Sequence, residues 1–175
     1  MKYIALLRGV NAGKRRRVEM KKLKTLFESL GCANVSTYLN SGNVIFDSSK
    51  KQDEISEEII SCLKKNLGFE IQTIVKTEKQ IKEIAKAIPR EWQNDSTQRT
   101  DVAYLFESID SSQTLDEFPV KKEYLNIRYI PGAIYWNVDR KYVLKSQLYK
   151  LIGHPLYQMM TVRNVNTARF LAGQS

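Results

Sequence analysis

The sequence predicts an α+β protein whose first half is a ferredoxin-like βαββαβ unit, and three observations lead to this fold class. Short apolar runs alternate with longer stretches in which apolar residues recur at helical spacing. A polar turn with a glycine, residues 40–43, separates two of the short runs as a hairpin does. The chain has 175 residues, 42% of them hydrophobic, which is enough for a core and excludes disordered, collagen-like and disulfide-stapled classes.

The first half contains four expected strands and two expected helices. The run at residues 3–7 is almost wholly apolar and predicts a central strand covered on both faces, and further strands are expected at 35–39, 44–46 and 71–75. The first helix is predicted by the spacing of Met20, Leu23, Leu26, Phe27 and Leu30, and Gly31 ends it. The second helix, ended by Gly68, is predicted by the stripe Ile55, Ile59, Cys62, Leu63 and Leu67, which makes Cys62 a small core residue.

The βαββαβ order predicts which loops meet. A right-handed crossover makes the first two strands parallel, and the third strand lies antiparallel between them. The loop at residues 8–18 and the turn at 40–43 therefore emerge at the same end of the sheet. We expect these two polar, glycine-bearing segments to form one shared rim.

The second half predicts a βαββ segment followed by closing helices. A capping box at 77–80 begins a helix that Pro89 ends. Strands are expected at 102–106, 125–129 and 134–138, with a short helix at 115–118 and closing helices at 143–152 and 164–171. This order echoes the first half as a weak topological repeat. We expect a ferredoxin-like half at 1–76 and a second α+β half at 77–175, packed together as one compact unit.

Three stretches, at residues 7–11, 38–46 and 161–167, read LRGVN, YLNSGNVIF and TVRNVNT. They resemble the signature stretches of the bacterial domain-of-unknown-function family 1697, and the resemblance covers essentially the whole chain. It implies an α+β fold of two intertwined ferredoxin-like halves. It implies no established activity and no established catalytic residues.

The most basic segment lies directly after the first strand. The formal net charge of the chain is +9, and residues 14–24 hold seven basic residues and one acidic residue, Glu19. Such a density attracts phosphate backbones and releases counterions on binding. A solvated face that aids solubility would have the same composition, and the sequence leaves both interpretations open. The candidate nucleic-acid-binding residues are Arg15, Arg16, Arg17, Lys21 and Lys22.

The expected rim supplies a second candidate site. Glycine lets backbone N–H groups converge, and asparagine and serine add donors, as in an anion-binding nest. The same residue types also serve ordinary turns, and neither Walker nor dinucleotide-binding glycine spacing is present. The candidate anion-binding residues at the rim are Arg8, Asn11, Gly13, Lys14, Asn40, Ser41 and Asn43.

A third candidate site lies before the last expected helix. Arg163 and Asn164 stand where free backbone N–H groups would attract a phosphate or carboxylate. Asn164 could equally serve only as the cap of that helix. Both interpretations remain open.

Conventional catalytic groups are scarce in this sequence. The single histidine, His154, lies between glycine and proline, and the two cysteines have no metal-ligand spacing. Asp101 and Asp139 could hold magnesium beside a phosphate or serve turns and caps. We therefore expect no cofactor and no metal site, and we assign no catalytic residue.

Two function classes follow, with a third alternative beside them. As a binding module, the protein would hold nucleic acid or another polyanion through the basic segment. As an enzyme, it would act on a phosphorylated small molecule at the rim. Alternatively, a homo-oligomer would form by edge pairing of its hairpins. The low cysteine content and the lack of a long apolar run predict a cytoplasmic protein with no membrane partner.

Overall fold

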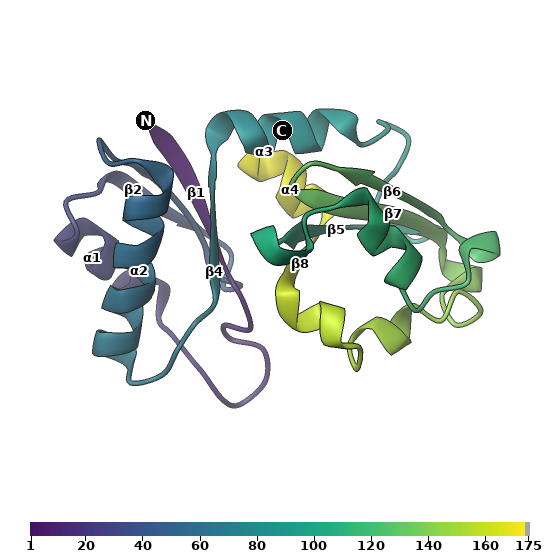
Figure 1. Cartoon of the computed structure of the whole chain (residues 1–175), viewed down its shortest axis with the longest axis horizontal. Helices are drawn as coiled ribbons and strands as arrows, with labels where there is room; N and C mark the ends of the chain where they lie inside the picture. Colours follow the sequence, from purple (N-terminus) through teal and green to yellow (C-terminus); the bar gives the residue numbers. More distant parts are fainter. Residues whose placement is uncertain (174–175) are drawn as a thin grey trace. The chain divides into compact units, whose positions relative to one another are not determined.

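The computed structural model describes residues 1–173 and confirms the α+β class. The chain divides into two compact units, Met1–Lys79 and Gln80–Ser175. Each unit contains a four-stranded antiparallel sheet (Figure 1). Among the described residues, no helix has the length and apolar character needed to cross a membrane.

The first unit has the predicted βαββαβ order. Its elements are β1 (Lys2–Leu7), α1 (Met20–Ser29), β2 (Ala33–Tyr38), β3 (Asn43–Asp47), α2 (Gln52–Leu67) and β4 (Thr73–Thr77). The strands lie in the order β2-β3-β1-β4, so β3 is antiparallel to both of its neighbours. This is the ferredoxin-like arrangement, in which β1 is central.

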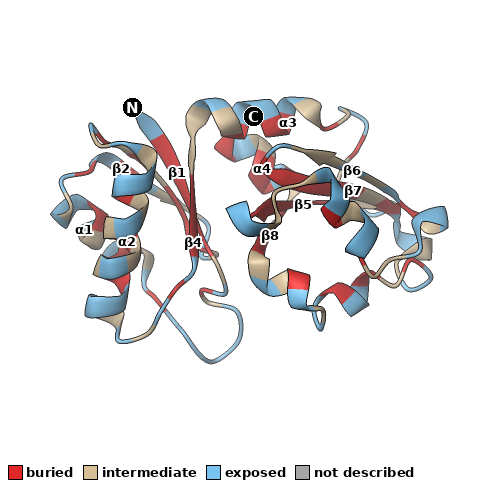
Figure 2. Cartoon of the chain, viewed as in Figure 1, coloured by how far each residue is buried: buried red, intermediate tan, exposed pale blue. Residues whose placement is uncertain are grey.

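The core of the first unit lies between one sheet face and helices α1 and α2. Alternate residues of β1 enter it, because successive side chains of a strand point to opposite faces. The rings of Phe27 in α1 and Phe46 in β3 meet edge to face with centroids 5.2 Å apart. Strand β1 is buried on both faces, as its apolar run predicts (Figure 2). The core residues of the helices are Leu23, Phe27, Ile55, Ile59 and Leu63.

Cys62 was expected in the core, but the cysteine that lies there is Cys32. Cys32 is only 7% exposed and belongs to the core, and burial raises the pKa of its thiol. Cys62 is half-buried and lines a groove of about 510 Å³ beside Leu30 and Asn66. The apolar stripe of α2 is wider than the face of the helix that the sheet covers. Cys62 lies at the edge of that covered face.

The second unit repeats the strand order of the first. Its regular elements are α3 (Glu78–Ala87, which begins just before the boundary), β5 (Gln98–Leu105), β6 (Asn126–Ile130), β7 (Ala133–Asp139), β8 (Met160–Asn164) and α4 (Val165–Leu171). The sheet order β6-β7-β5-β8 corresponds, strand for strand, to β2-β3-β1-β4. Short 3₁₀ segments connect β5 to β6, namely η1 (Glu107–Ile109), η2 (Ser112–Glu117) and η3 (Lys122–Tyr124).

The predicted closing helix at 143–152 does not form. This stretch contains turns, flanked and interrupted by η4 (Arg140–Tyr142), η5 (Leu148–Leu151) and η6 (Pro155–Met159). Gln147 has a φ of +61°, a left-handed conformation that an α-helix cannot include. Leu148 and Leu151 are buried three residues apart, a spacing that suits a 3₁₀ turn as well as an α-helix.

Strand β8 was not predicted from the sequence. Its residues Met160–Asn164 pair antiparallel with β5, and Arg163 lies opposite Val102. From the sequence, Thr161 and Arg163 were expected only to precede or open the last helix. Because strand faces alternate, both residues lie on the face opposite to Met160, which enters the core with Trp136.

Candidate functional site

The β1–α1 loop, residues 8–19, begins at the end of the central strand. The Leu7 amide N–H donates to the Gly42 carbonyl at 2.9 Å, and the Arg8 amide N–H donates to the Gln72 carbonyl at 2.9 Å. The first bond fixes the start of the loop beside the β2–β3 turn, and the second joins it to the residue before β4. The structure thus brings the two segments together, as the strand order predicts.

Asn11 holds the loop closed and joins it to the turn. Its Oδ1 accepts the Val18 amide N–H at 2.8 Å, and its Nδ2 donates to the carbonyls of Val18 at 2.9 Å and Asn40 at 2.8 Å. Its backbone has a φ of +56°, which asparagine adopts more readily than most residues. All three directions of this amide are used inside the chain, so Asn11 positions the loop.

The β2–β3 turn is held by similar bonds. Asn43 is fully buried, and its Nδ2 donates to the Tyr38 carbonyl at 2.9 Å and the Ser41 Oγ at 3.0 Å. Gly42 has a φ of +78°, and a Cβ there would lie 2.8 Å from the Cβ of Leu7. The turn sequence is therefore set by backbone conformation and close approach to β1.

A cavity of about 680 Å³ opens between the β1–α1 loop and the turn. Arg17 brings a positive charge to its wall and Glu19 brings a negative one. A small anion would meet the Glu19 carboxylate together with an Asn11 amide that is already engaged. The cavity is lined by Asn11, Arg17, Val18, Glu19, Met20 and Asn40.

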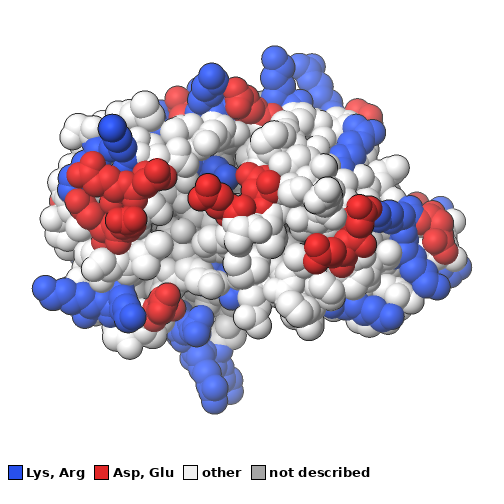
Figure 3. Space-filling model, in the orientation of Figure 1, with Lys and Arg blue, Asp and Glu red and all other residues white. Residues whose placement is uncertain are grey.

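The cations at residues 14–22 of the β1–α1 loop and the start of α1 project into solvent. Each is exposed, and within residues 1–173 none of their side chains forms an ion pair or hydrogen bond. Figure 3 shows Lys and Arg side chains projecting at the lower end of the first unit, where Figure 1 places this loop. We call these residues the basic cluster: Lys14, Arg15, Arg16, Arg17, Lys21 and Lys22.

Gly13 and Arg8 complete the predicted rim residues. Gly13 has a φ of +86° at the exposed part of the loop, with open space around it. Arg8 is half-buried at the start of the loop. Asn40 is exposed, Ser41 is half-buried, and the Asn40 carbonyl is the group that Asn11 contacts.

Arg163 and Asn164 belong to the second unit, where Asn164 takes the capping role that the sequence left open and Arg163 lies in a strand. Arg163 lies in β8 and is 8% exposed, and its Nη1 donates to Thr161 Oγ1 at 2.8 Å and to the Val162 carbonyl at 2.9 Å. Burial lowers the pKa of its guanidinium to about 10. Asn164 caps α4, because its Oδ1 accepts the Thr167 amide N–H at 2.9 Å.

Sequence reasoning missed a buried tyrosine on the same sheet face. Tyr104 lies opposite Thr161 in β5 and is fully buried, and its hydroxyl has no hydrogen-bond partner within residues 1–173. Burial raises the pKa of this phenol, and the nearby charge of Arg163 opposes the rise. The sequence signal that could have found this tyrosine is the alternation of polar and apolar residues at 160–163. It predicts a strand with Thr161 and Arg163 on one face, the face that Tyr104 shares.

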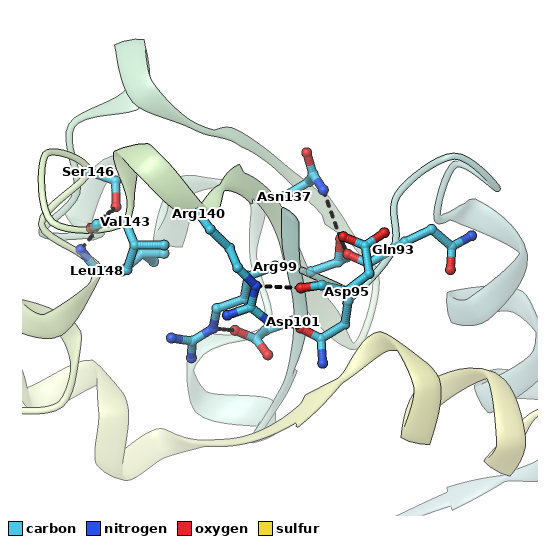
Figure 4. Close-up of polar contacts among 11 residues, drawn as sticks. Gln93, Asp95, Arg99, Asp101, Asn137, Arg140, Val143, Ser146 and Leu148 are labelled. Carbon is cyan, nitrogen blue, oxygen red and sulfur yellow. Dashed lines mark hydrogen bonds and ion pairs between the residues drawn. The ribbon is translucent and has the colours of Figure 1, made fainter. Parts of the chain in front are cut away.

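A second polar cluster lies at the Gln98–Asp139 end of the second sheet (Figure 4). Arg99 Nε contacts Asp101 Oδ2 at 2.6 Å, and the Asp101 side chain is only 7% exposed. Burial raises the pKa of this carboxyl, although Arg99 opposes the shift. The indole N–H of Trp136, directly opposite on β7, also lies near the carboxylate without hydrogen-bond geometry. Arg140 Nε donates to the Asp95 carbonyl beside this pair.

The remaining catalytic candidates have structural partners. His154 Nδ1 accepts the Leu156 amide N–H at 3.3 Å and caps η6. Asp139 caps η4 and pairs with Lys141 at 3.2 Å. In the described part of the chain, no three His, Cys, Asp or Glu residues gather into a potential metal site.

Fold and site together define an α+β protein with two sheets of the same strand order and one exposed basic loop. Residues 1–135 match the family described as "Protein of unknown function (DUF1697)". The chain therefore belongs to the DUF1697 family. The stretches at 7–11 and 38–46 lie within the matched residues, and the stretch at 161–167 lies outside them.

A solved structure shares this fold. The conserved bacterial protein SP0830 from Streptococcus pneumoniae superposes with a TM-score of 0.86, over 99% of this chain and 97% of that chain. The two sequences are 22% identical, so the likeness concerns the fold. No curated protein matches this chain.

Proposed function

We propose that this protein binds nucleic acid through the basic cluster, mainly by contacts to phosphates. The observation that supports this most directly is that the cations of this cluster are exposed and unpaired within residues 1–173. A cation without a carboxylate partner keeps its full attraction for a phosphate. Counterion release then drives binding with little sequence preference.

The hydrogen bonds of Asn11 support this proposal, because they give the loop a defined shape. The loop is closed across Asn11 and Val18 and is tied to Asn40. A loop that is already ordered loses less conformational entropy when it binds. Asn11, Ser41 and Asn43 would act as positioning residues, while the arginine and lysine side chains contact the phosphates.

A phosphorylated small molecule at the rim is the second candidate, and the cavity beside Arg17 favours it. The Glu19 carboxylate on the same wall opposes an anion there, which is why we place this candidate second. Inorganic phosphate tests it: a rise in Tm that Arg17→Ala abolishes and Arg90→Ala retains would support a small-anion site. No rise in Tm would remove it.

The test of the main proposal compares two variants that lose the same charge. The loop variant carries Lys14→Ala, Arg15→Ala, Arg16→Ala and Arg17→Ala. The control variant removes four exposed cations elsewhere in the same unit, with Lys2→Ala, Lys51→Ala, Lys64→Ala and Lys65→Ala. Both lower the formal charge by four, so a difference between them reports the position and the pairing of the cations, because Lys2 and Lys64 pair with Glu78 and Glu70.

We expect the loop variant to elute from heparin at clearly lower salt than the control variant and to purify without nucleic acid. The expected result follows from the loss of unpaired cations on an ordered loop. Equal elution of the two variants would show that the net charge acts without a site. That result would remove the proposal. Both cysteines are free, and we place this function in the cytoplasm.

A further inference from the structure

Two tyrosines of the second unit form an aromatic pair on short 3₁₀ segments. Tyr124 ends η3 and Tyr142 ends η4, and their ring centroids lie 5.7 Å apart with an interplanar angle of 43°. Both residues are half-buried, and Tyr142 also packs against the core of the unit. The Lys121 amide N–H donates to the Ser146 carbonyl at 2.8 Å and ties the two segments together.

Lysines lie over this pair. The Nζ of Lys141 is 4.9 Å from the Tyr142 centroid, and the Nζ of Lys145 is 5.7 Å from Tyr142 and 6.0 Å from Tyr124. Lys145 forms no ion pair within residues 1–173, whereas Lys141 also contacts Asp139 at 3.2 Å. We call Tyr124, Tyr142, Lys141 and Lys145 the tyrosine patch.

The tyrosine patch combines the two features that single-stranded nucleic acid requires. A nucleobase stacks on an aromatic side chain, and the neighbouring phosphate contacts a cation. A lysine ammonium on a flexible stem can leave the ring for a phosphate, and a base then takes its place. A purely anionic polymer without bases would use the lysines and leave the rings without a function.

We propose that the tyrosine patch binds the unpaired bases of a single nucleic-acid strand. This inference rests on the proposed function and deepens it, because it names single-stranded nucleic acid as the substrate class. The basic cluster supplies contacts to phosphates without regard to base. The tyrosine patch distinguishes a strand with exposed bases from a strand without them.

The test compares labelled oligo(dT) with an abasic oligonucleotide of the same length and charge, each titrated with the full chain by fluorescence anisotropy. Wild type should bind oligo(dT) about tenfold more tightly than the abasic strand, the size expected for one stacked base. Tyr142→Leu should remove this preference and leave the affinity for the abasic strand within about twofold.

Two further variants serve as controls. Tyr149→Leu removes a tyrosine that is 58% exposed and lies outside the tyrosine patch, and it should leave both affinities unchanged. Tyr142→Phe keeps the ring and should retain the preference. Equal binding of the two strands by wild type, or an equal loss for both strands in Tyr142→Leu, would overturn the inference.

A second measurement does not depend on the folding of a variant. Irradiation of wild type bound to a bromouracil oligonucleotide should crosslink the base to a peptide that contains Tyr124 or Tyr142. Crosslinks confined to other peptides would overturn the inference. If the loop variant weakens both strands equally, the proposed function holds whether or not the tyrosine patch selects bases. If wild type binds neither strand, the proposed function itself fails.

Discussion

Asn11 was predicted from the sequence to bind an anion, but its hydrogen bonds give it a positioning role. The sequence places it in a polar loop with the donors of an anion nest. The structure uses its amide for three hydrogen bonds inside the chain, to Val18 and Asn40. A buried or half-buried amide whose groups are all paired gains nothing by exchanging one partner for an anion.

Asn11→Ala tests this positioning role. The variant loses three hydrogen bonds and places alanine at a φ of +56°, so we expect the free energy of unfolding to fall by about 2–4 kcal/mol. Affinity for nucleic acid should also fall, although no charge is lost. Urea unfolding and anisotropy titration measure the two effects.

Asn34→Ala is the matched control for that experiment. Asn34 also has a left-handed φ, +51°, but it is exposed and its side chain makes one bond, to Asp47 at 2.8 Å. It should cost about 1–2 kcal/mol and leave nucleic-acid binding intact. If Asn11→Ala bound nucleic acid as wild type does, the hydrogen bonds of Asn11 would not be needed for binding.

Asp101 gives a prediction about pH. Burial raises the pKa of this carboxyl in the folded chain above its ordinary value of 3.8. The folded chain therefore keeps this proton to higher pH than the unfolded chain, and the group lowers stability as pH rises through that interval. Asp101→Asn lacks this ionisation. Its free energy of unfolding, relative to that of wild type, should therefore increase as pH rises above about 3.8. Urea unfolding at a series of pH values measures the difference, and a difference that does not change with pH would contradict this account.

At the scale of elements, the first unit was predictable because its local signals agree with its topology. Apolar spacing gave both helices, Gly42 marked the hairpin, and the strand order followed from the right-handed crossover. The meeting of the β1–α1 loop with the turn is a consequence of that order. The bonds made by Asn11 were not predictable, because they depend on how the loop closes on Val18.

The second unit was less predictable because its connections are 3₁₀ segments and turns. The stretch at 143–152 has buried leucines at a spacing that both an α-helix and a 3₁₀ turn allow. The left-handed φ of Gln147, which excludes an α-helix, has no signal in the sequence. Strand β8 is short and carries a buried arginine, which sequence patterns associate with exposed loops. Burial of Arg163 depends on pairing with β5, a partner far away in the sequence.

Asn164 provides a test at the level of one helix end. Asn164→Ala removes the cap of α4 and should lower the free energy of unfolding by about 1 kcal/mol. Asn164→Asp keeps an oxygen for the Thr167 amide and should retain the stability of wild type. If Asn164 held an anion instead, inorganic phosphate would stabilise wild type and fail to stabilise Asn164→Asp. Urea unfolding with and without phosphate separates these two outcomes.

At the scale of the whole molecule, charge is concentrated in one segment. The first unit has fifteen Lys and Arg against nine Asp and Glu, an excess of six. Residues 14–24 have seven basic residues and one acidic residue, which is the same excess. Outside this segment the charges of the first unit balance, so its electrostatic attraction for a polyanion has one source.

The salt dependence of binding is the sharpest test of whether the basic cluster is the nucleic-acid site. The affinity of a labelled oligonucleotide is measured against salt concentration for wild type, the loop variant and the control variant. Each phosphate contact contributes about 0.7–0.9 to the slope of log affinity against log salt, so the loop variant should lose about three units of slope. We expect a markedly smaller loss of slope for the control variant. Equal losses in the two variants would show that net charge alone drives binding and that the basic cluster is not a site.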